Sequence, residues 1–275
     1  MQTAGTIERI RAMLAGMPRP HGLVPTMGAL HGGHLSLVAA ARAECQTVSA
    51  SVFVNPLQFA AGEDLERYPR DLEGDIAKLQ EHGLDVLFSP DAAEMYPPGF
   101  STNVDVGEMG GTYEGAVRPT HFRGVATVVA KLLTIMQPDV LFLGQKDAQQ
   151  TAVLRRLVRD LAFPVEVRIV PTVRDSDGLA LSSRNAYLGT QEREAAPTLY
   201  AALTAMRLLL HQGMTKEAAL AQAKSILSPL AQLDYLDIVS ANTFQPLSSL
   251  KVPAFIIGAA RFGKTRLLDN LWITK

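Results

Sequence analysis

Short apolar runs alternate with segments of helical apolar spacing over residues 1–170. This alternation predicts β-α-β units, and therefore a parallel sheet with helices on both faces. The predicted strands span residues 22–26, 48–54, 85–88, 140–143 and 165–170. The predicted helices lie at 37–45, 76–83, 125–136 and 154–161. The first part of the chain is thus expected to form a Rossmann-like domain.

The pattern changes after Pro171, where amphipathic helices are followed by strand-like runs without further β-α-β alternation. The predicted elements are helices at 199–210 and 220–227 and strands at 235–239, 254–260 and 265–272. Such an arrangement, with a tight turn between the last two strands, indicates a small α+β domain. We therefore expect an α/β fold with two domains, a Rossmann-like parallel-sheet domain over residues 1–172 and a smaller α+β domain over residues 173–275.

The charge balance argues against nucleic-acid or membrane partners. The 275 residues carry 26 basic and 27 acidic side chains, a net charge of −1. The N-terminus has no basic region followed by an apolar run, and the apolar stretch at 125–136 is interrupted by Lys131. The single cysteine, Cys45, cannot form an intramolecular disulfide or a cysteine-based metal site. We expect a soluble, cytoplasmic protein.

Residues 258–265 match the P-loop pattern G-x-x-x-x-G-K-[ST] letter for letter. A P-loop requires a long helix after the motif and a further strand with a magnesium-binding aspartate. Only ten residues follow Thr265, which is too short for both. We therefore expect a β-hairpin in which Gly263 supplies the turn conformation.

A stronger candidate for phosphate chemistry is the segment Pro-Thr-Met-Gly-Ala-Leu-His-Gly-Gly-His at 25–34, at the end of the first predicted strand. Its glycines allow a ligand to approach the backbone, and the helix expected to begin near His34 offers free N–H groups and a positive dipole end. His31 and His34 could both donate hydrogen bonds to phosphate. A structural histidine pair remains the alternative, and the spacing does not fit a zinc-protease helix.

Two further clusters supply cations and hydrogen-bond donors. The segment Gly-Gln-Lys-Asp-Ala-Gln-Gln at 144–150 follows a predicted strand, at the sheet edge where ligands bind in parallel α/β folds. The segment Ser-Ser-Arg-Asn at 182–185 adds two hydroxyls and a guanidinium, a combination suited to a polyphosphate. Each cluster alone is also typical of an ordinary loop.

Together these motifs resemble the pantoate–β-alanine ligase (pantothenate synthetase) family, within the nucleotidyltransferase-like α/β superfamily that carries an H-x-G-H motif. The resemblance rests on segments 25–34, 52–59, 68–71, 121–125, 146–150, 178–185 and 259–270, which occur in the family's order. Two positions depart from the expected pattern: Thr120 replaces a glycine, and Gln145 stands where glutamate is frequent.

The resemblance implies ATP-dependent amide formation. Pantoate would attack the α-phosphorus of ATP to give pantoyl adenylate and pyrophosphate, and the amine of β-alanine would then displace AMP. It also implies Mg²⁺ carried by ATP, a homodimer, and a second domain that closes over the site. A related nucleotidyltransferase acting on a phosphorylated substrate and a nucleotide-binding regulator without turnover are the alternatives.

The resemblance also assigns roles to individual residues. Its expected catalytic residues are His34, Lys146 and Arg184. The expected ATP-binding residues are Met27, Gly28, His31, His34, Gly144, Lys146, Asp147, Val173, Leu181, Ser182, Ser183 and Arg184. Gln58 and Gln150 are expected to bind the substrate acid, because neutral amides hold a carboxylate without fully compensating its charge. No metal ligand is assigned: Asp71 or Asp75 could reach the Mg²⁺ ion, but we expect both to be exposed helical carboxylates.

Overall fold

The structure is a computed structural model that describes residues 1–60, 62–63 and 65–274. The chain forms two compact units, each described separately below. Unit 1 comprises Met1–Gly144 and Val153–Val170, and unit 2 comprises Gln145–Ala152 and Pro171–Lys275.

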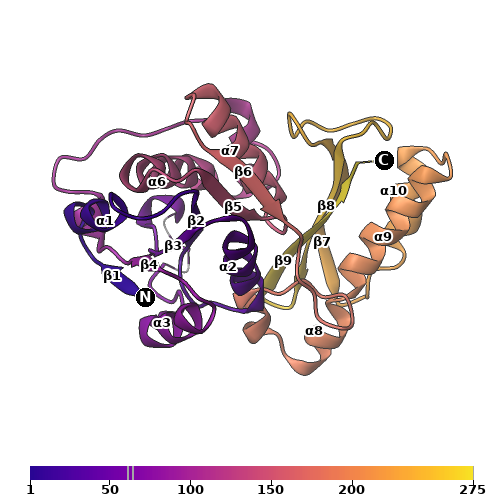
Figure 1. Cartoon of the computed structure of the whole chain (residues 1–275). Coiled ribbons are helices and arrows are strands. Elements are labelled where there is room, and N and C mark those ends of the chain that lie inside the picture. Colours follow the sequence, from indigo (N-terminus) through magenta and orange to yellow (C-terminus); the bar gives the residue numbers. More distant parts are fainter. Residues whose placement is uncertain (61, 64, 275) are drawn as a thin grey trace. The chain divides into compact units, whose positions relative to one another are not determined.

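Within its described part, unit 1 contains a six-stranded parallel sheet in the order β1-β4-β3-β2-β5-β6 (Figure 1). The strands are β1 (Gln2–Ala4), β2 (His21–Thr26), β3 (Thr47–Val52), β4 (Val86–Phe88), β5 (Val140–Gly144) and β6 (Glu166–Val170). The five predicted strands of this region are all present, with shifted ends. β1 was not predicted from the sequence; it pairs in parallel with β4 at the sheet edge.

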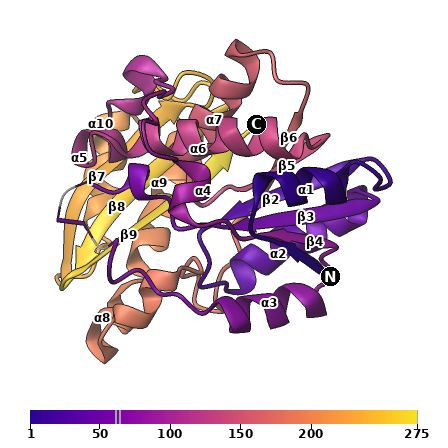
Figure 2. The ribbon, with the colours of Figure 1, turned by 90° about the vertical axis from the view of Figure 1, so that its left-hand side faces the viewer.

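Helices cover both faces of this sheet, as the alternating pattern predicts (Figure 2). They are α1 (Ile7–Leu14), α2 (Gly32–Glu44), α3 (Leu72–Glu81), α4 (Ala92–Met95), α5 (Glu114–Val117), α6 (His121–Met136) and α7 (Ala148–Asp160), with 3-10 turns η1 (Pro56–Gln58) and η2 (Gly107–Gly110). One core cluster joins α1, α6 and the later part of α7 to the sheet, and another joins α2 and α3 to its opposite face.

The strand order places a topological switch point beside β2. β2 pairs with β3 on one side and with β5 on the other, through the registers Gly22↔Val140 and Leu23↔Leu141. In open parallel sheets, ligands bind outside the carboxyl ends of the strands at such a point. The loop after β2 and the end of β5 at Gly144 therefore begin at the edge where a ligand is expected.

The substitution of Thr120 for the expected glycine is accommodated without strain. Thr120 precedes α6 with φ −99° and ψ −8°, in the right-handed region open to any residue. The backbone therefore does not require glycine here. Most residues of α6 are buried, because the helix contacts α1, η1 and η2 as well as the sheet.

Unit 2 contains, over its described residues, a three-stranded antiparallel sheet in the order β7-β8-β9. Its elements are β7 (Ala231–Ser240), β8 (Ala254–Phe262), β9 (Thr265–Ile273), α8 (Thr190–Ala195), α9 (Thr198–His211), α10 (Lys216–Lys224) and η3 (Ser183–Tyr187). Leu203, Met206 and Leu210 of α9 share a core cluster with Ile238 and Ile256 of the sheet. This arrangement of α9 and α10 on one sheet is visible in Figure 1.

The P-loop-like segment is a hairpin, as expected. β8 and β9 pair through Phe262↔Thr265, so that Gly263 and Lys264 form the turn. Gly263 has φ +58°, and a Cβ atom here would collide with the side chain of Glu192. The Thr265 hydroxyl donates to the carbonyl of Tyr187 at 3.4 Å, so it is engaged within the fold. Among the described residues, no helix has both the length and the apolar character needed to cross a membrane.

Candidate active site

The loop after β2 adopts a conformation that few sequences tolerate. Gly28 has φ +86° and Ala29 has φ +53°, so two consecutive residues lie in the left-handed region. A Cβ atom on Gly28 would lie 2.9 Å from Asp75 Oδ2 and 3.2 Å from Val52 Cγ1. Glycine is thus required by both conformation and close packing. Ala29 carries a side chain, which costs about 1 kcal/mol in this conformation.

The carboxylate of Asp75 on α3 stabilises this loop. Its Oδ2 accepts a hydrogen bond from Ala29 N and its Oδ1 accepts one from Leu30 N, both at 2.8 Å. Lys78, one turn further along α3, donates Nζ to the Leu30 carbonyl at 3.0 Å. The Asp75 residue is only 1% exposed, so the expectation of an exposed helical carboxylate was wrong. Buried carboxylates need such partners, and charge-assisted hydrogen bonds to backbone N–H groups supply them.

His31 and His34 cap the amino end of α2 reciprocally. His31 Nδ1 accepts from Gly33 N at 3.1 Å, and His34 Nδ1 accepts from His31 N at 3.3 Å. The ring centroids lie 4.1 Å apart. Because Nδ1 of each neutral ring is an acceptor, the ring proton lies on Nε2 and is oriented for donation. The two histidines are therefore a structural pair that also presents Nε2–H donors. The helix begins at Gly32, not near His34, and its Gly33 N–H is occupied by His31, so this group is not one of the free N–H groups expected at the helix end.

Gln58 is held with its amide nitrogen toward Met27. It is buried, and its Oε1 accepts a hydrogen bond from Asn55 Nδ2 at 3.1 Å. Asn55 Oδ1 in turn accepts from the Tyr96 hydroxyl at 2.8 Å, and burial raises the pKa of that hydroxyl. The orientation leaves Gln58 Nε2 as a donor to Met27 Sδ at 2.8 Å. A thioether is a weak acceptor, so a carboxylate would be a better partner for this N–H group.

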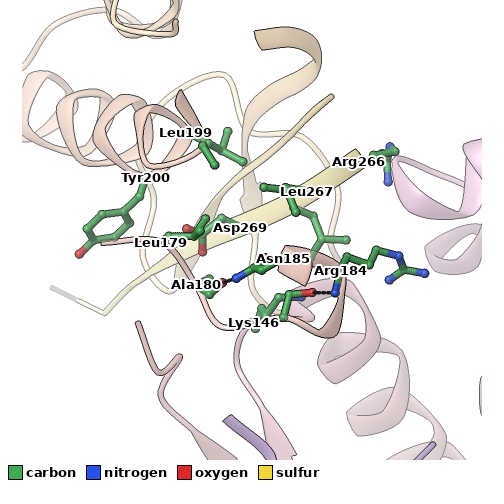
Figure 3. Close-up of a pocket in the computed structure, with 13 residues that line it drawn as sticks. Lys146, Leu179, Ala180, Arg184, Asn185, Leu199, Tyr200, Arg266, Leu267 and Asp269 are labelled. Carbon is green, nitrogen blue, oxygen red and sulfur yellow. Dashed lines mark hydrogen bonds between the residues drawn. The ribbon is translucent and has the colours of Figure 1, made fainter. Parts of the chain in front are cut away.

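In unit 2, a pocket of about 420 Å³, counted with its solvent-open part, contains three of the predicted phosphate ligands (Figure 3). Lys146, Ser182 and Arg184 lie in its lining together with apolar side chains of α9 and β9. Lys146 Nζ lies 3.5 Å from Asp147 Oδ1, and the Lys146 side chain is 21% exposed. A partly buried ammonium group with one carboxylate neighbour is suited to an anionic ligand.

The loop that carries Ser182 and Arg184 begins with a short antiparallel pairing between two backbone segments, at residues 173–174 and 180–181. Leu181 N donates to the Val173 carbonyl at 3.0 Å, and an isolated bridge joins Arg174 to Ala180. Ser182 then caps η3, because its Oγ accepts from Arg184 N at 3.3 Å. The sequence predicts Val173, Leu181 and this serine-arginine segment as separate ligands, and the structure joins them in one loop.

The predicted site residues are divided between the two units. Unit 1 carries Met27, Gly28, His31, His34, Gln58 and Gly144, and unit 2 carries Lys146, Asp147, Gln150, Val173, Leu181, Ser182, Ser183 and Arg184. Within unit 1, Gln58 contacts Met27, and the two histidines contact each other. Within unit 2, the residues from the two phosphate segments share one pocket, while Gln150 is half-buried in the first turn of α7.

The described residues offer no cage of side chains for a metal ion. Over residues 1–60, 62–63 and 65–274, no three His, Cys, Asp or Glu side chains are grouped so that they could hold one. Asp75, considered above as a magnesium ligand, directs both carboxylate oxygens to backbone N–H groups instead.

Comparison with known proteins identifies the family. The family model described as pantoate-beta-alanine ligase matches residues 2–272. The chain belongs to the pantoate–β-alanine ligase family. A pantothenate synthetase from Thermus thermophilus is 54% identical over 275 residues, covering 98% of this chain and 99% of that protein. Another, from Herpetosiphon aurantiacus, is 49% identical with the same coverage.

Solved structures agree with this assignment. A crystal structure of the pantothenate synthetase from Thermus thermophilus has a TM-score of 0.95 at 53% identity and covers 100% of both chains. A pantoate–β-alanine ligase from Francisella tularensis, described as complexed with beta-gamma ATP and β-alanine, has a TM-score of 0.80 at 35% identity, with coverage of 99% and 97%. The predicted family, α/β fold class and enzyme class are confirmed. The activity is the family's known reaction, the ATP-dependent condensation of pantoate with β-alanine.

Proposed function

We propose that the condensation proceeds through a pantoyl-adenylate intermediate, with ATP bound by the residues named below. A pantoate carboxylate oxygen attacks the α-phosphorus, and the bond from that phosphorus to the pyrophosphate oxygen breaks. The neutral amine of β-alanine then attacks the acyl carbon; the acyl–oxygen bond breaks, AMP leaves and the nitrogen loses a proton. The observation that carries this proposal is that Lys146, Ser182 and Arg184, from two separate segments, line one pocket.

The residues that we propose for the triphosphate are those with cationic or hydroxyl groups. Lys146 and Arg184 offset the negative charge that develops as pyrophosphate leaves, and Ser182 and Ser183 donate hydrogen bonds to phosphate oxygens. His34 contributes its Nε2–H, since its Nδ1 is engaged in the helix cap. In this proposal, Lys146 exchanges its Asp147 partner for phosphate, which frees the Asp147 carboxylate to accept from ribose hydroxyls.

The remaining ATP contacts proposed here involve loops and apolar side chains. They are Met27, Gly28, His31 and Gly144 of unit 1 and Val173 and Leu181 of unit 2. The position of Gly28 in the loop after β2, beyond the carboxyl end of that strand, supports its assignment, because ligands bind at this edge of parallel sheets.

We propose Gln58 and Gln150 as donors to pantoate. Gln58 Nε2 now donates to the Met27 sulfur, and a carboxylate or hydroxyl oxygen of pantoate would be a stronger acceptor. Two neutral amides hold the acid without the charge compensation of an arginine, so the carboxylate stays nucleophilic.

Mg²⁺ enters the proposal as part of the ATP substrate. Magnesium in such sites is usually held by phosphate oxygens, waters and few protein groups. We further propose a cytoplasmic homodimer, a state that light scattering of the purified protein would test. The single buried thiol of Cys45 is compatible with a reducing compartment.

The test measures both half-reactions. Incubation with ATP and pantoate alone should release pyrophosphate up to about one equivalent per site, and addition of β-alanine should yield the amide and AMP in equal amounts. Lys146→Ala should slow pyrophosphate release by about 10²- to 10³-fold. Lys264→Ala, which removes an exposed lysine of the β8–β9 turn, is the matched control and should retain the normal rate. Normal pyrophosphate release by Lys146→Ala would refute the role of Lys146.

A further inference from the structure

The side chain of Asn270 on β9 is hydrogen-bonded to the segment that carries Lys146. Its Nδ2 donates to the carbonyl oxygens of Gln145 at 2.9 Å and of Lys146 at 2.8 Å. Its Oδ1 accepts from Gln145 Nε2 at 3.2 Å. Asn270 is 1% exposed, so both amide protons and the acceptor are used inside the protein. Gln145, which stands where glutamate is frequent in the family, has a structural role here. A glutamine amide can donate to Asn270, whereas a glutamate carboxylate cannot.

The preceding residue of β9, Asp269, binds Arg174, at the start of the loop that leads to the other proposed phosphate-binding segment, Ser182–Arg184. Its carboxylate accepts two hydrogen bonds from Arg174, at 2.5 and 2.9 Å, and both side chains are largely buried. Arg174 also donates to the Gly178 carbonyl at 3.0 Å and stacks over the Tyr200 ring at 3.7 Å. Arg174 opens the loop that leads to Ser182–Arg184, and Asp269 lines the same pocket (Figure 3).

Asp269 and Asn270 are also connected to each other and to Arg174. Asn270 N donates to Asp269 Oδ1 at 2.7 Å, and Arg174 Nη2 donates to the Asn270 carbonyl at 3.3 Å. Two consecutive residues of one strand therefore bind the Gln145–Lys146 segment and Arg174, which begins the loop that leads to Ser182–Arg184. β9 pairs with β8 along its whole length, from Thr265 to Ile273, and such a paired strand is a rigid reference for these contacts.

We propose that Asn270 is a positioning residue for Lys146, and that through its link to Asp269 it sets the spacing between Lys146 and the Ser182–Arg184 segment. The inference rests on the proposed role of Lys146 in binding the triphosphate. By donating to two consecutive carbonyl groups, Asn270 fixes the peptide planes from which the Lys146 side chain projects. Without these donors the two carbonyls need other partners, and the segment shifts to find them.

The expected effect of Asn270→Ala is a loss of about 10²-fold in kcat/KM for ATP, because a shift of about 1 Å in a positioned group has a cost of this order. The KM for β-alanine, which does not depend on the triphosphate ligands, should change less than threefold. Asn242→Ala removes an exposed asparagine of the same unit and is the matched control, with unchanged kinetics.

A double-mutant cycle with Lys146→Ala separates positioning from general destabilisation. If Asn270 acts through Lys146, adding Asn270→Ala to Lys146→Ala should lower kcat/KM by less than about threefold, although it lowers it about 10²-fold alone. Full multiplication of the two losses, or normal kinetics of Asn270→Ala, would overturn the inference. Normal kinetics of Lys146→Ala would instead refute the proposed function.

A second substitution covers the case in which Asn270→Ala does not fold. Asn270→Ser keeps one donor in a smaller side chain that cannot reach both carbonyl groups. It should give a smaller loss in kcat/KM for ATP, with the same lack of additivity with Lys146→Ala. Additive losses in this second cycle would also contradict the positioning role.

Discussion

Protonation of His21 should make the stability of unit 1 depend on pH in a defined window. His21 begins β2, at the amino end of the strand and thus opposite to the loops that we propose to bind ATP, and is 2% exposed. Its Nε2 lies 2.6 Å from Ser49 Oγ, and its backbone N–H donates to Asp139 Oδ2. Burial is the main cause that lowers the pKa of His21 from 6.5 to about 4, and the charge of Arg19 lowers it further, while Asp139 opposes the change.

The direction and the size of the change in unfolding free energy follow from proton linkage. In the folded state, where its pKa is lower, His21 stays neutral as the pH falls through 6.5. In the unfolded state, His21 takes up a proton over the same pH range. Stability is therefore fully present above about pH 7.5 and declines as the pH falls toward 4. The interval from 6.5 to about 4 corresponds to about 3.4 kcal/mol at about 1.36 kcal/mol per pH unit. Of this, about 2 kcal/mol should be lost by pH 5.

Urea unfolding followed by circular dichroism at pH 7.5 and pH 5.0 measures the effect. The loss of unfolding free energy between the two pH values should be about 2 kcal/mol larger for the native sequence than for His21→Gln, which cannot titrate here. His211→Gln, at an exposed position of unit 2, controls for removal of a histidine and should keep the native pH dependence. An equal loss in the native sequence and in His21→Gln would refute the reasoning.

Three further substitutions test the acid pocket, the loop after β2 and the core of unit 2. Gln150→Ala should raise the KM for pantoate more than tenfold while the KM for ATP changes little; equal changes would contradict its assignment to the acid. Asp75→Asn replaces a carboxylate acceptor of two backbone N–H groups by an amide, and should lower the unfolding free energy by about 2 kcal/mol and raise the KM for ATP; an unchanged KM would separate this loop from nucleotide binding. Leu203→Ala should cost about 2 to 5 kcal/mol in urea unfolding because Leu203 is fully buried, whereas Leu208→Ala, at a position 59% exposed, should cost little; similar costs would contradict the assigned core.

The sequence predicts the sheet of unit 1 well where a strand is a continuous apolar run between turn signals. β5 is such a run; β2 and β3 combine shorter apolar stretches with small residues such as Ser49 and Ser51, and all three strands are largely buried. The three-residue strand β1 has no such run. It exists through its pairing with β4, about 80 residues away in the chain, and local pattern carries little information on such a pairing.

The site residues that the sequence missed are polar side chains on buried faces. Asp75 is spaced four residues from Leu79, so both lie on the same side of α3, and Leu79 is 1% exposed. An acidic residue on an apolar helix face is a signal for a buried partner, although it cannot identify the N–H groups of Ala29 and Leu30. Asp269 and Asn270 give a similar signal, since they interrupt the apolar sequence of β9. Their partners come from segments distant in sequence, which only the fold brings together.

In the proposed mechanism, the division of donors between the two units matches the two chemical requirements of adenylation. Unit 1 supplies neutral donors, the Gln58 amide and the histidine Nε2–H groups, whose orientations follow from the hydrogen bonds that occupy their other polar atoms. Unit 2 supplies the cations Lys146 and Arg184. A nucleophilic carboxylate must be bound without losing its charge density, whereas a departing pyrophosphate needs that charge offset. Replacing Gln58 by arginine should therefore tighten pantoate binding yet slow pyrophosphate release, while faster release would show that charge compensation at the acid is not limiting.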